Sequence, residues 1–256
     1  MNVFFLVLAR DKTHVYDKIN ELKGLGFPFK IICGEKIEHP NVIYQAARGK
    51  FAAINFGLTQ LPSNVEIVAM NDVDTRIHNF ELALKYFSNK KVGLVFGTEL
   101  VNEGPQKLFF QIFNPIRRLI PAAGSGELML VRKDLLSKIV PLKPCKAEDT
   151  YILFKVLETG HKIVFCEDCF AETERTKTAE KEEPYKRKTV TGIYQALSYS
   201  NPPIMVRLFY MALPLTSPIL LILGKRGYFW MRGILLGLID YLRGDKSGIW
   251  NTDYLK

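Results

Sequence analysis

Two aspartates, Asp72 and Asp74, stand one residue apart directly after an apolar segment of the chain. Two ionised carboxylates this close repel each other, so a site that holds both normally includes a cation. Carboxylate oxygens favour Mg²⁺ or Mn²⁺, and these metals commonly bridge protein carboxylates to substrate phosphates. Aspartate is also common in tight turns after strands, where its side chain forms hydrogen bonds with the backbone of the turn. The pair therefore indicates either a metal-dependent phosphate site or an ordinary turn.

A second pair of acids, Glu148 and Asp149, opens a segment with helical spacing of apolar residues. Aspartate at a helix start can simply cap the helix. It can also act as a general base that removes a proton from a substrate hydroxyl. The order along the chain favours the base, because the small residues Gly124, Ser125 and Gly126 stand between the two acidic motifs.

Predicted strands and helices alternate up to about residue 170. Apolar runs predict strands at residues 3–9, 29–33, 42–44, 66–70, 92–96, 128–131 and 162–166. Apolar spacings of three and four predict helices at residues 15–22, 49–61, 80–87 and 149–157. Strands joined by such helices form a largely parallel sheet covered on both faces. The predicted fold class is therefore α/β, with a Rossmann-like sheet flanked by helices.

Ligands of such sheets bind beyond the carboxyl ends of the strands. Residues at these ends are therefore candidates for binding. Besides the turn at Asp72, they are Arg10 and Asp11 after the first strand, together with its last residue Ala9, and Gly34 and Glu35 after the second strand.

Five segments in order resemble the inverting family-2 glycosyltransferases of GT-A fold. Residues 49–58 (GKFAAINFGL) resemble the family's G-K-x-x-A-x-N-x-G-L helix, and residues 71–74 (NDVD) match its D-x-D motif. Residues 126–136 resemble its acceptor-side segment, residues 148–151 (EDTY) its base motif, and residues 160–165 (GHKIVF) the strand that follows. The resemblance spans roughly residues 1–195, and it implies a GT-A fold.

The resemblance also implies roles. Asp72 would face the ribose and the metal, Asp74 would bind the metal on the diphosphate, and Asp149 would deprotonate the acceptor hydroxyl. The loop of Gly124, Ser125 and Gly126 and the side chain of Glu148 would lie on the acceptor side. Lys50 would lie near the nucleotide, although it equally fits a surface lysine at a helix start. The implied cofactor is Mg²⁺ or Mn²⁺, and the implied donor is a UDP- or GDP-sugar.

The chain departs from the family pattern twice. Members usually carry an aspartate after the second strand, where this chain has Gly34 and Glu35, so Glu35 is the candidate substitute. Processive members carry a Q-x-x-R-W motif, and the matching residues 185–189 (YKRKT) lack its Gln and Trp, so we expect a non-processive enzyme. Arg187 and Lys188 are candidates for holding a diphosphate, with a solvated basic run as the alternative.

The 256-residue chain has a formal net charge of +9, which attracts phosphates or anionic lipid. No zinc-finger, RNP or basic-zipper pattern is present, so we expect no nucleic-acid partner. Cys166 and Cys169 lack the further ligands of a zinc site, which leaves a disulfide pair or ordinary strand residues. Residues 171–188 are polar and predict a loop or mobile segment.

The C-terminal part is apolar. Residues 204–223 are long enough to span a bilayer, which takes about 20 residues, but they contain Arg207, Pro214 and Pro218. A span would also leave the following basic residues outside, against the positive-inside bias. Residues 228–242 predict a helix in the membrane interface. The alternatives are a dimer interface or a helix folded onto the core.

We therefore expect a GT-A glycosyltransferase domain at residues 1–200 and a membrane-associating helical segment at residues 201–256. The expected reaction is metal-dependent, inverting transfer of a hexosyl-type sugar from a nucleotide sugar to a hydroxyl or phosphate of a lipid-linked or glycan acceptor. Membrane contact through residues 203–243 would be peripheral or monotopic, on the cytoplasmic face, because the short apolar N-terminus predicts a buried strand rather than a signal peptide. The sequence leaves open whether the protein forms a homodimer.

Two other functions remain as alternatives. A sugar-phosphate nucleotidyltransferase would need a glycine-rich loop after the first strand, and residues 9–12 (ARDK) lack glycine. A non-catalytic, membrane-associated scaffold of the same fold is the other alternative, and the presence of Asp72, Asp74 and Asp149 argues against it.

Overall fold

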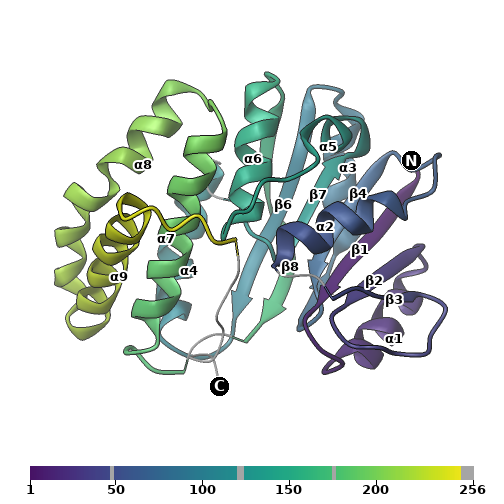
Figure 1. The fold of residues 1–256 in the computed structure, drawn as a ribbon, viewed down its shortest axis with the longest axis horizontal. Coiled ribbons are helices and arrows are strands. Elements are labelled where there is room, and N and C mark those ends of the chain that lie inside the picture. Colours follow the sequence, from purple (N-terminus) through teal and green to yellow (C-terminus); the bar gives the residue numbers. More distant parts are fainter. Residues whose placement is uncertain (47–48, 120–123, 175–176, 249–256) are drawn as a thin grey trace.

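A computed structural model describes residues 1–46, 49–119, 124–174 and 177–248 of the chain (Figure 1). The strands are β1 (Val3–Ala9), β2 (Phe29–Cys33), β3 (Val42–Tyr44), β4 (Ile67–Asp72), β5 (Thr75–His78), β6 (Val92–Val101), β7 (Leu128–Arg132) and β8 (Lys162–Thr173). The helices are α1 (Val15–Leu25), α2 (Lys50–Thr59), α3 (Phe80–Lys85), α4 (Gln106–Leu119), α5 (Lys133–Ile139), α6 (Glu148–Glu158), α7 (Glu182–Tyr199), α8 (Ile204–Thr216) and α9 (Lys225–Leu242). Two short 3-10 helices, η1 (Tyr86–Ser88) and η2 (Ser217–Leu223), complete the elements of these described ranges.

These strands form one sheet in the order β3-β2-β1-β4-β7-β6-β8-β5. Strands β1 to β4 pair in parallel, and β6 and β8 also run parallel to each other. β7 runs antiparallel between β4 and β6, and β5 runs antiparallel to β8. The predicted α/β class with a mostly parallel sheet is therefore confirmed.

The sheet separates two apolar cores. All seven residues of β1 are buried, with Phe4, Leu6 and Leu8 in one core and Phe5 and Val7 in the other. This alternation explains why the strand is a continuous apolar run, since both of its faces are covered. Helices α1 and α3 supply the second core, whereas α2, α5, α6 and α7 supply the first. The C-terminal helices lie beyond α6 on that first face (Figure 1).

The region after β8 differs from the sequence prediction. The polar composition of residues 171–188 predicts a loop, but β8 continues to Thr173 and α7 begins at Glu182. The polar residues of α7 have partners that the local sequence does not reveal. Glu182 is buried and accepts hydrogen bonds from Trp230 Nε1 and Gln106 Nε2, at 2.5 and 2.9 Å.

Helix α9 folds back onto α7 (Figure 1). A Cβ atom at Gly233 would lie 2.7 Å from the carbonyl oxygen of Glu183, and one at Gly237 would lie 2.5 Å from that of Arg187. The two glycines therefore allow a closer approach of the helices than any side chain would permit. Trp230 is 1% exposed. For residues 228–242 the sequence left open a helix in the membrane interface, a dimer interface and a helix folded onto the core. The face of α9 that carries Trp230, Gly233 and Gly237 is folded onto the core.

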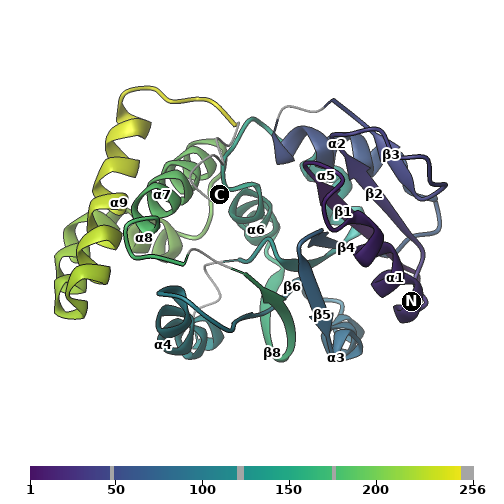
Figure 2. The ribbon, with the colours of Figure 1, turned by 90° about the horizontal axis from the view of Figure 1, so that it is seen from below.

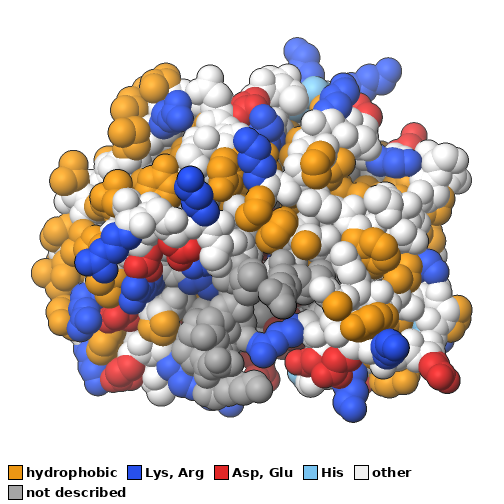
Figure 3. Space-filling model, in the orientation of Figure 1, with side chains coloured by type: hydrophobic (Ala, Val, Ile, Leu, Met, Phe, Trp, Pro, Cys, Tyr) orange, Lys and Arg blue, Asp and Glu red, His pale blue; other side chains and the backbone are white. Residues whose placement is uncertain are grey.

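The segment Ile204–Leu223, made of α8 and η2, is long and apolar enough to cross a membrane by length and composition. Only 17% of its most apolar 18-residue stretch is buried inside the structure. Hydrophobic side chains gather on the side of the molecule where α8 lies (compare Figures 1 and 3). The large exposed ones in this segment are Ile204, Met205, Leu208, Phe209, Met211, Leu215, Ile219, Leu221 and Ile222.

Candidate active site

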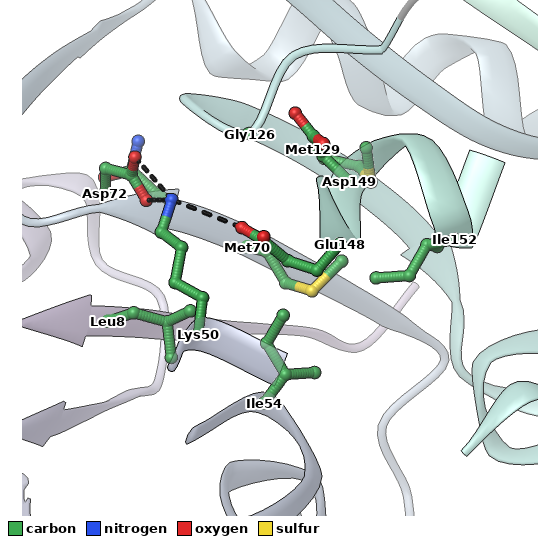
Figure 4. A pocket seen from close by; sticks show the side chains of 11 residues that line it. Leu8, Lys50, Ile54, Met70, Asp72, Gly126, Met129, Glu148, Asp149 and Ile152 are labelled. Carbon is green, nitrogen blue, oxygen red and sulfur yellow. Dashed lines mark hydrogen bonds and ion pairs between the residues drawn. The ribbon is translucent and has the colours of Figure 1, made fainter. Parts of the chain in front are cut away.

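Helices α2 and α6 lie near strands β1 and β4 (Figure 2). A pocket opens where these strands end beside the two helices (Figure 4). β1 pairs with β4 in parallel, so that Leu8 lies opposite Asp72 at the last residue of β4. Lys50 is the first residue of α2, and Glu148 and Asp149 are the first two of α6. All four charged residues line this pocket, together with Leu8, Ile54, Met70, Asn71, Gly126, Met129 and Ile152.

Lys50 is held between two acids. Its Nζ lies 2.6 and 2.7 Å from the two carboxylate oxygens of Asp72 and 3.5 Å from Oε1 of Glu148. The Lys50 and Asp72 side chains keep 24% and 21% of their surface exposed, whereas Glu148 is buried. The ammonium therefore neutralises acids that come from two separate elements, and its end faces the pocket (Figure 4).

The titration behaviour of the pocket follows from burial. Burial raises the pKa of Asp72 to about 6, although Lys50 opposes the change. Burial also raises the pKa of Glu148 to about 7, again against the effect of Lys50. Burial would lower the pKa of Lys50, but the carboxylates of Asp72 and Glu148 outweigh it and raise that pKa.

Asp149 lies on the same pocket, beside the loop that carries Gly126 (Figure 4). Its Oδ1 accepts a hydrogen bond from the backbone N–H of Thr150 at 2.6 Å, and burial raises its pKa. A Cβ atom at Gly126 would lie 3.3 Å from Asp149 Oδ2 and 3.6 Å from Lys50 Nζ. Glycine at this position therefore keeps the space between the acid and the lysine open.

Asp74 lies on the other side of the turn. It lines a larger cavity of about 930 Å³ that also borders on His14, Lys18 and Arg76. The charge of Asp74 still contributes to raising the pKa of Asp72, so the two carboxylates interact across the turn. Within the described ranges, no group of three or more His, Cys, Asp or Glu side chains is arranged to hold a metal ion. A metal at this turn would need ligands from a substrate.

The structure adds a lysine that the sequence prediction missed. Lys18 is 1% exposed, and its Nζ donates to Asn71 Oδ1 at 2.7 Å and to the carbonyl oxygen of Thr75, and it pairs with Glu21 Oε2 at 2.7 Å. Burial lowers the pKa of Lys18, and Glu21 opposes this effect. Its position next to Ile19 on the apolar face of α1 was the available signal, because lysine is rarely buried without partners.

Glu127 was also missed as a site residue. It is buried directly before β7, and its Oε2 accepts a hydrogen bond from Ser125 Oγ. Its charge contributes to the raised pKa values of Asp72 and Asp149. The backbone carbonyl of Glu127 accepts from Asn71 Nδ2, so this loop is tied to the residue that precedes Asp72.

Other predicted residues lie outside the lining of the Asp72 pocket. Ala9 is the last residue of β1 and Arg10 follows it, and a Cβ atom at Gly34 would lie 2.3 Å from the carbonyl oxygen of Arg10. Glu35 Oε2 accepts a hydrogen bond from the Lys12 N–H at 3.2 Å. The ends of β1 and β2 are therefore adjacent, but Ala9, Arg10 and Glu35 do not line the pocket of the carboxylate cluster.

Arg187 and Lys188, the residues predicted to hold a diphosphate, make other contacts. Arg187 donates from Nε and Nη2 to the two carboxylate oxygens of Asp240 in α9, at 2.5 and 2.6 Å. Lys188 is buried, with its Nζ 4.9 Å from the centre of the Tyr185 ring. Neither side chain borders the Asp72 pocket. The structure gives Arg187 a role in joining α7 to α9.

Comparison with solved structures identifies the architecture. The chain superposes on the mannosyltransferase PcManGT from Pyrobaculum calidifontis, solved with GDP-Man and Mn²⁺, with a TM-score of 0.70, 14% identity, and coverage of 95% of this chain and 88% of that one. The chain has the GT-A fold. Glucosyl-3-phosphoglycerate synthase from M. tuberculosis (TM-score 0.54, 13% identity, 79% and 81% coverage) and TarS from S. aureus (TM-score 0.50, 14% identity, 96% and 92% coverage) are further neighbours.

The GT-A assignment confirms the fold that the motif order implied. No protein-family model and no curated protein matches the sequence. At identities of this size the likeness concerns the fold.

Proposed function

We propose that this protein transfers a sugar from a nucleotide-diphosphate sugar to an acceptor hydroxyl or phosphate, with inversion at the sugar. The observation that carries the proposal is the convergence of Asp72, Glu148 and Asp149 on one pocket at the carboxyl ends of the strands. The fold likeness to PcManGT, a mannosyltransferase solved with GDP-Man and Mn²⁺, supports a UDP- or GDP-sugar as the donor and a divalent metal as the cofactor.

The donor atoms of the site fit a hard divalent cation. Asp72 and Asp74 offer carboxylate oxygens, which suit Mg²⁺ and Mn²⁺, and the substrate diphosphate would complete the coordination. When bound, the metal would neutralise the negative charge that develops on the leaving diphosphate. Asp72 and Asp74 are the residues proposed to hold it, with Asp72 facing the ribose side.

Asp149 is the proposed general base. Its carboxylate lies beside Gly126, where the absence of a side chain leaves room for an acceptor group. Removal of the acceptor proton by Asp149 makes the oxygen a better nucleophile during attack. Gly124, Ser125, Gly126 and Glu148 form the proposed acceptor side. Attack opposite the leaving diphosphate inverts the anomeric centre and requires no nucleophile from the protein.

The proposed acceptor is linked to lipid. The exposed apolar face of α8 and η2 suits contact with a bilayer, and the basic residues Lys225 and Arg226 at the start of α9 suit anionic headgroups. A lipid-linked acceptor stays at the bilayer surface, so an enzyme held there meets it directly. We propose residues 1–200 as the transferase domain and residues 201–256 as the segment that mediates peripheral or monotopic contact with the cytoplasmic face.

Donor binding and transfer test the proposal separately. Thermal unfolding is measured with UDP-, GDP- and dTDP-sugars with and without Mn²⁺, because a ligand that binds only the folded state raises the unfolding temperature. We expect one nucleotide sugar to raise the unfolding temperature, and to do so only when Mn²⁺ is present. The Asp74→Ala variant should show no such increase. With that donor and a lipid extract, Asp149→Asn should retain donor binding and lose at least about a hundredfold in turnover.

Two results would count against this function. Undiminished sugar transfer by the Asp149→Asn variant would show that Asp149 is not the general base. Release of pyrophosphate from a nucleoside triphosphate and a sugar phosphate, without transfer from any nucleotide sugar, would instead identify a nucleotidyltransferase.

A further inference from the structure

Lys50 lies where the proposed function requires a divalent cation. Its Nζ contacts both carboxylate oxygens of Asp72, at 2.6 and 2.7 Å. A metal on the same oxygens would bring two positive centres within a few ångströms, and their repulsion is strong in a partly buried site. The ammonium and the metal therefore cannot share Asp72 in this arrangement.

We propose that Lys50 is an internal counter-cation that leaves Asp72 and moves to Glu148 when a divalent cation binds. The inference rests on the proposed metal site at Asp72. In the absence of metal, Lys50 keeps the buried acids neutralised. When metal binds, the ammonium of Lys50 moves to Glu148, so that Asp72 and Glu148 each keep a positive partner.

Glu148 is suited to receive the lysine. Its Oε1 already lies 3.5 Å from Lys50 Nζ, so a short movement would give full hydrogen-bond contact. Its Oε2 is buried and has no hydrogen-bond partner among the described residues. A buried acceptor without a hydrogen bond destabilises the folded state, and a donor that reaches it removes this penalty. The four-carbon lysine side chain is flexible enough to make this exchange.

The surroundings of Lys50 direct the movement. The lining residues Leu8, Ile54 and Met70 lie on the side of the pocket where the lysine stem runs and offer no alternative acceptor from their side chains (Figure 4). A Cβ atom at Gly126 would lie 3.6 Å from Nζ, so glycine leaves the space above the ammonium unfilled. The acids of β4 and α6 therefore mark the two ends of the movement.

The exchange predicts that Lys50 weakens metal binding. Mn²⁺ alone must displace the ammonium from Asp72, whereas Mn²⁺ with a nucleoside diphosphate also offers phosphate oxygens to the lysine. Metal and nucleotide should therefore bind with positive coupling, and the coupling should depend on Lys50.

Titration with Mn²⁺, followed by electron paramagnetic resonance of the free ion, tests this with Lys50→Met, Lys50→Arg and Glu148→Gln. Without nucleotide, K50M should bind Mn²⁺ at least about tenfold more tightly than wild type, and K50R should resemble wild type. E148Q should weaken Mn²⁺ binding in the wild-type background and have no effect in the K50M background. Lys36→Met, at an exposed lysine, is the matched control.

Equal or weaker Mn²⁺ binding by folded K50M would overturn the exchange. If K50M does not fold, the E148Q result decides, because unchanged Mn²⁺ affinity in E148Q contradicts a transfer of charge to Glu148. A failure of the proposed function looks different. In that case wild type, K50M and Asp72→Asn would all fail to bind Mn²⁺, with UDP or GDP present as well as without, and both ideas would be overturned together.

Discussion

The ammonium of Lys18 donates a hydrogen bond to the side chain of Asn71 over 2.7 Å, which ties α1 to the residue that precedes Asp72. Asn71 in turn donates to Thr75 Oγ1 at 2.8 Å and to the carbonyl oxygen of Glu127. The turn between Asp72 and Asp74 is therefore held from both ends by buried polar contacts.

We expect Lys18→Met to lower the free energy of unfolding by about 2–4 kcal/mol, because it leaves Asn71 and Glu21 without their buried donor. Nucleotide binding in the presence of Mn²⁺ should weaken as well, since the turn loses its support. Urea unfolding and donor titration measure the two effects. Lys23→Met, at an exposed position of the same helix, should change neither, and a stable K18M with normal donor binding would contradict the role of Lys18.

Gly126→Ala should lower turnover by about tenfold or more while the fold is kept. The added methyl group would lie 3.3 Å from Asp149 Oδ2 and would narrow the space proposed for the acceptor. The expected signature is a larger effect on transfer than on donor binding, measured by steady-state kinetics and donor titration. Gly24→Ala is the matched control, because a methyl group there would meet no side chain or distant backbone atom within 4 Å.

The metal-free protein should lose stability as pH rises from about 4 to about 7. Burial raises the pKa values of Asp72 and Glu148 to about 6 and about 7, above those of the unfolded chain near 4. The folded state therefore binds more protons in this interval, so the free energy of unfolding falls with increasing pH. Urea midpoints in EDTA should show the decline, and Glu148→Gln should flatten it.

The exposed Glu38 provides the control for that series, because Glu38→Gln removes a carboxylate outside the lining of the pocket. A slope that is the same in E148Q, E38Q and wild type would show that the buried acid does not govern the pH dependence.

Leu215 and Ile222 are 84% and 83% exposed, so replacing both with glutamine should not destabilise the fold. Binding to vesicles that contain anionic lipid should weaken by at least about tenfold, because each apolar side chain contributes about 1.5–3 kcal/mol when fully buried. Vesicle sedimentation and urea unfolding measure the two properties. Tyr16→Gln, at an exposed aromatic residue of α1, should leave vesicle binding unchanged, and unaltered binding by the double variant would exclude this face as the contact.

The sequence predicted the elements that rely on local patterns. The strand before Asp72 and the helix that begins with Glu148 and Asp149 follow from apolar spacing, and their ends place the acids at one pocket. It did not predict α7 in place of a loop, because Glu182 and Arg187 find their partners, Trp230 and Asp240, about fifty residues later. Nor could it show that Lys50 contacts Asp72 and Glu148 together, since that depends on how three elements meet.

The packing of α9 on α7 through Gly233 and Gly237 makes the end of the chain part of the structure that supports the pocket, because α7 also packs against α6, the helix of Asp149. Proteolytic clipping before α9 would uncover Trp230's partner Glu182 and loosen the support of α6 at the same time. If residues 201–256 contact a bilayer as proposed, cutting them off would release the protein and disturb the pocket in the same event, so a freely diffusing, active fragment would not form.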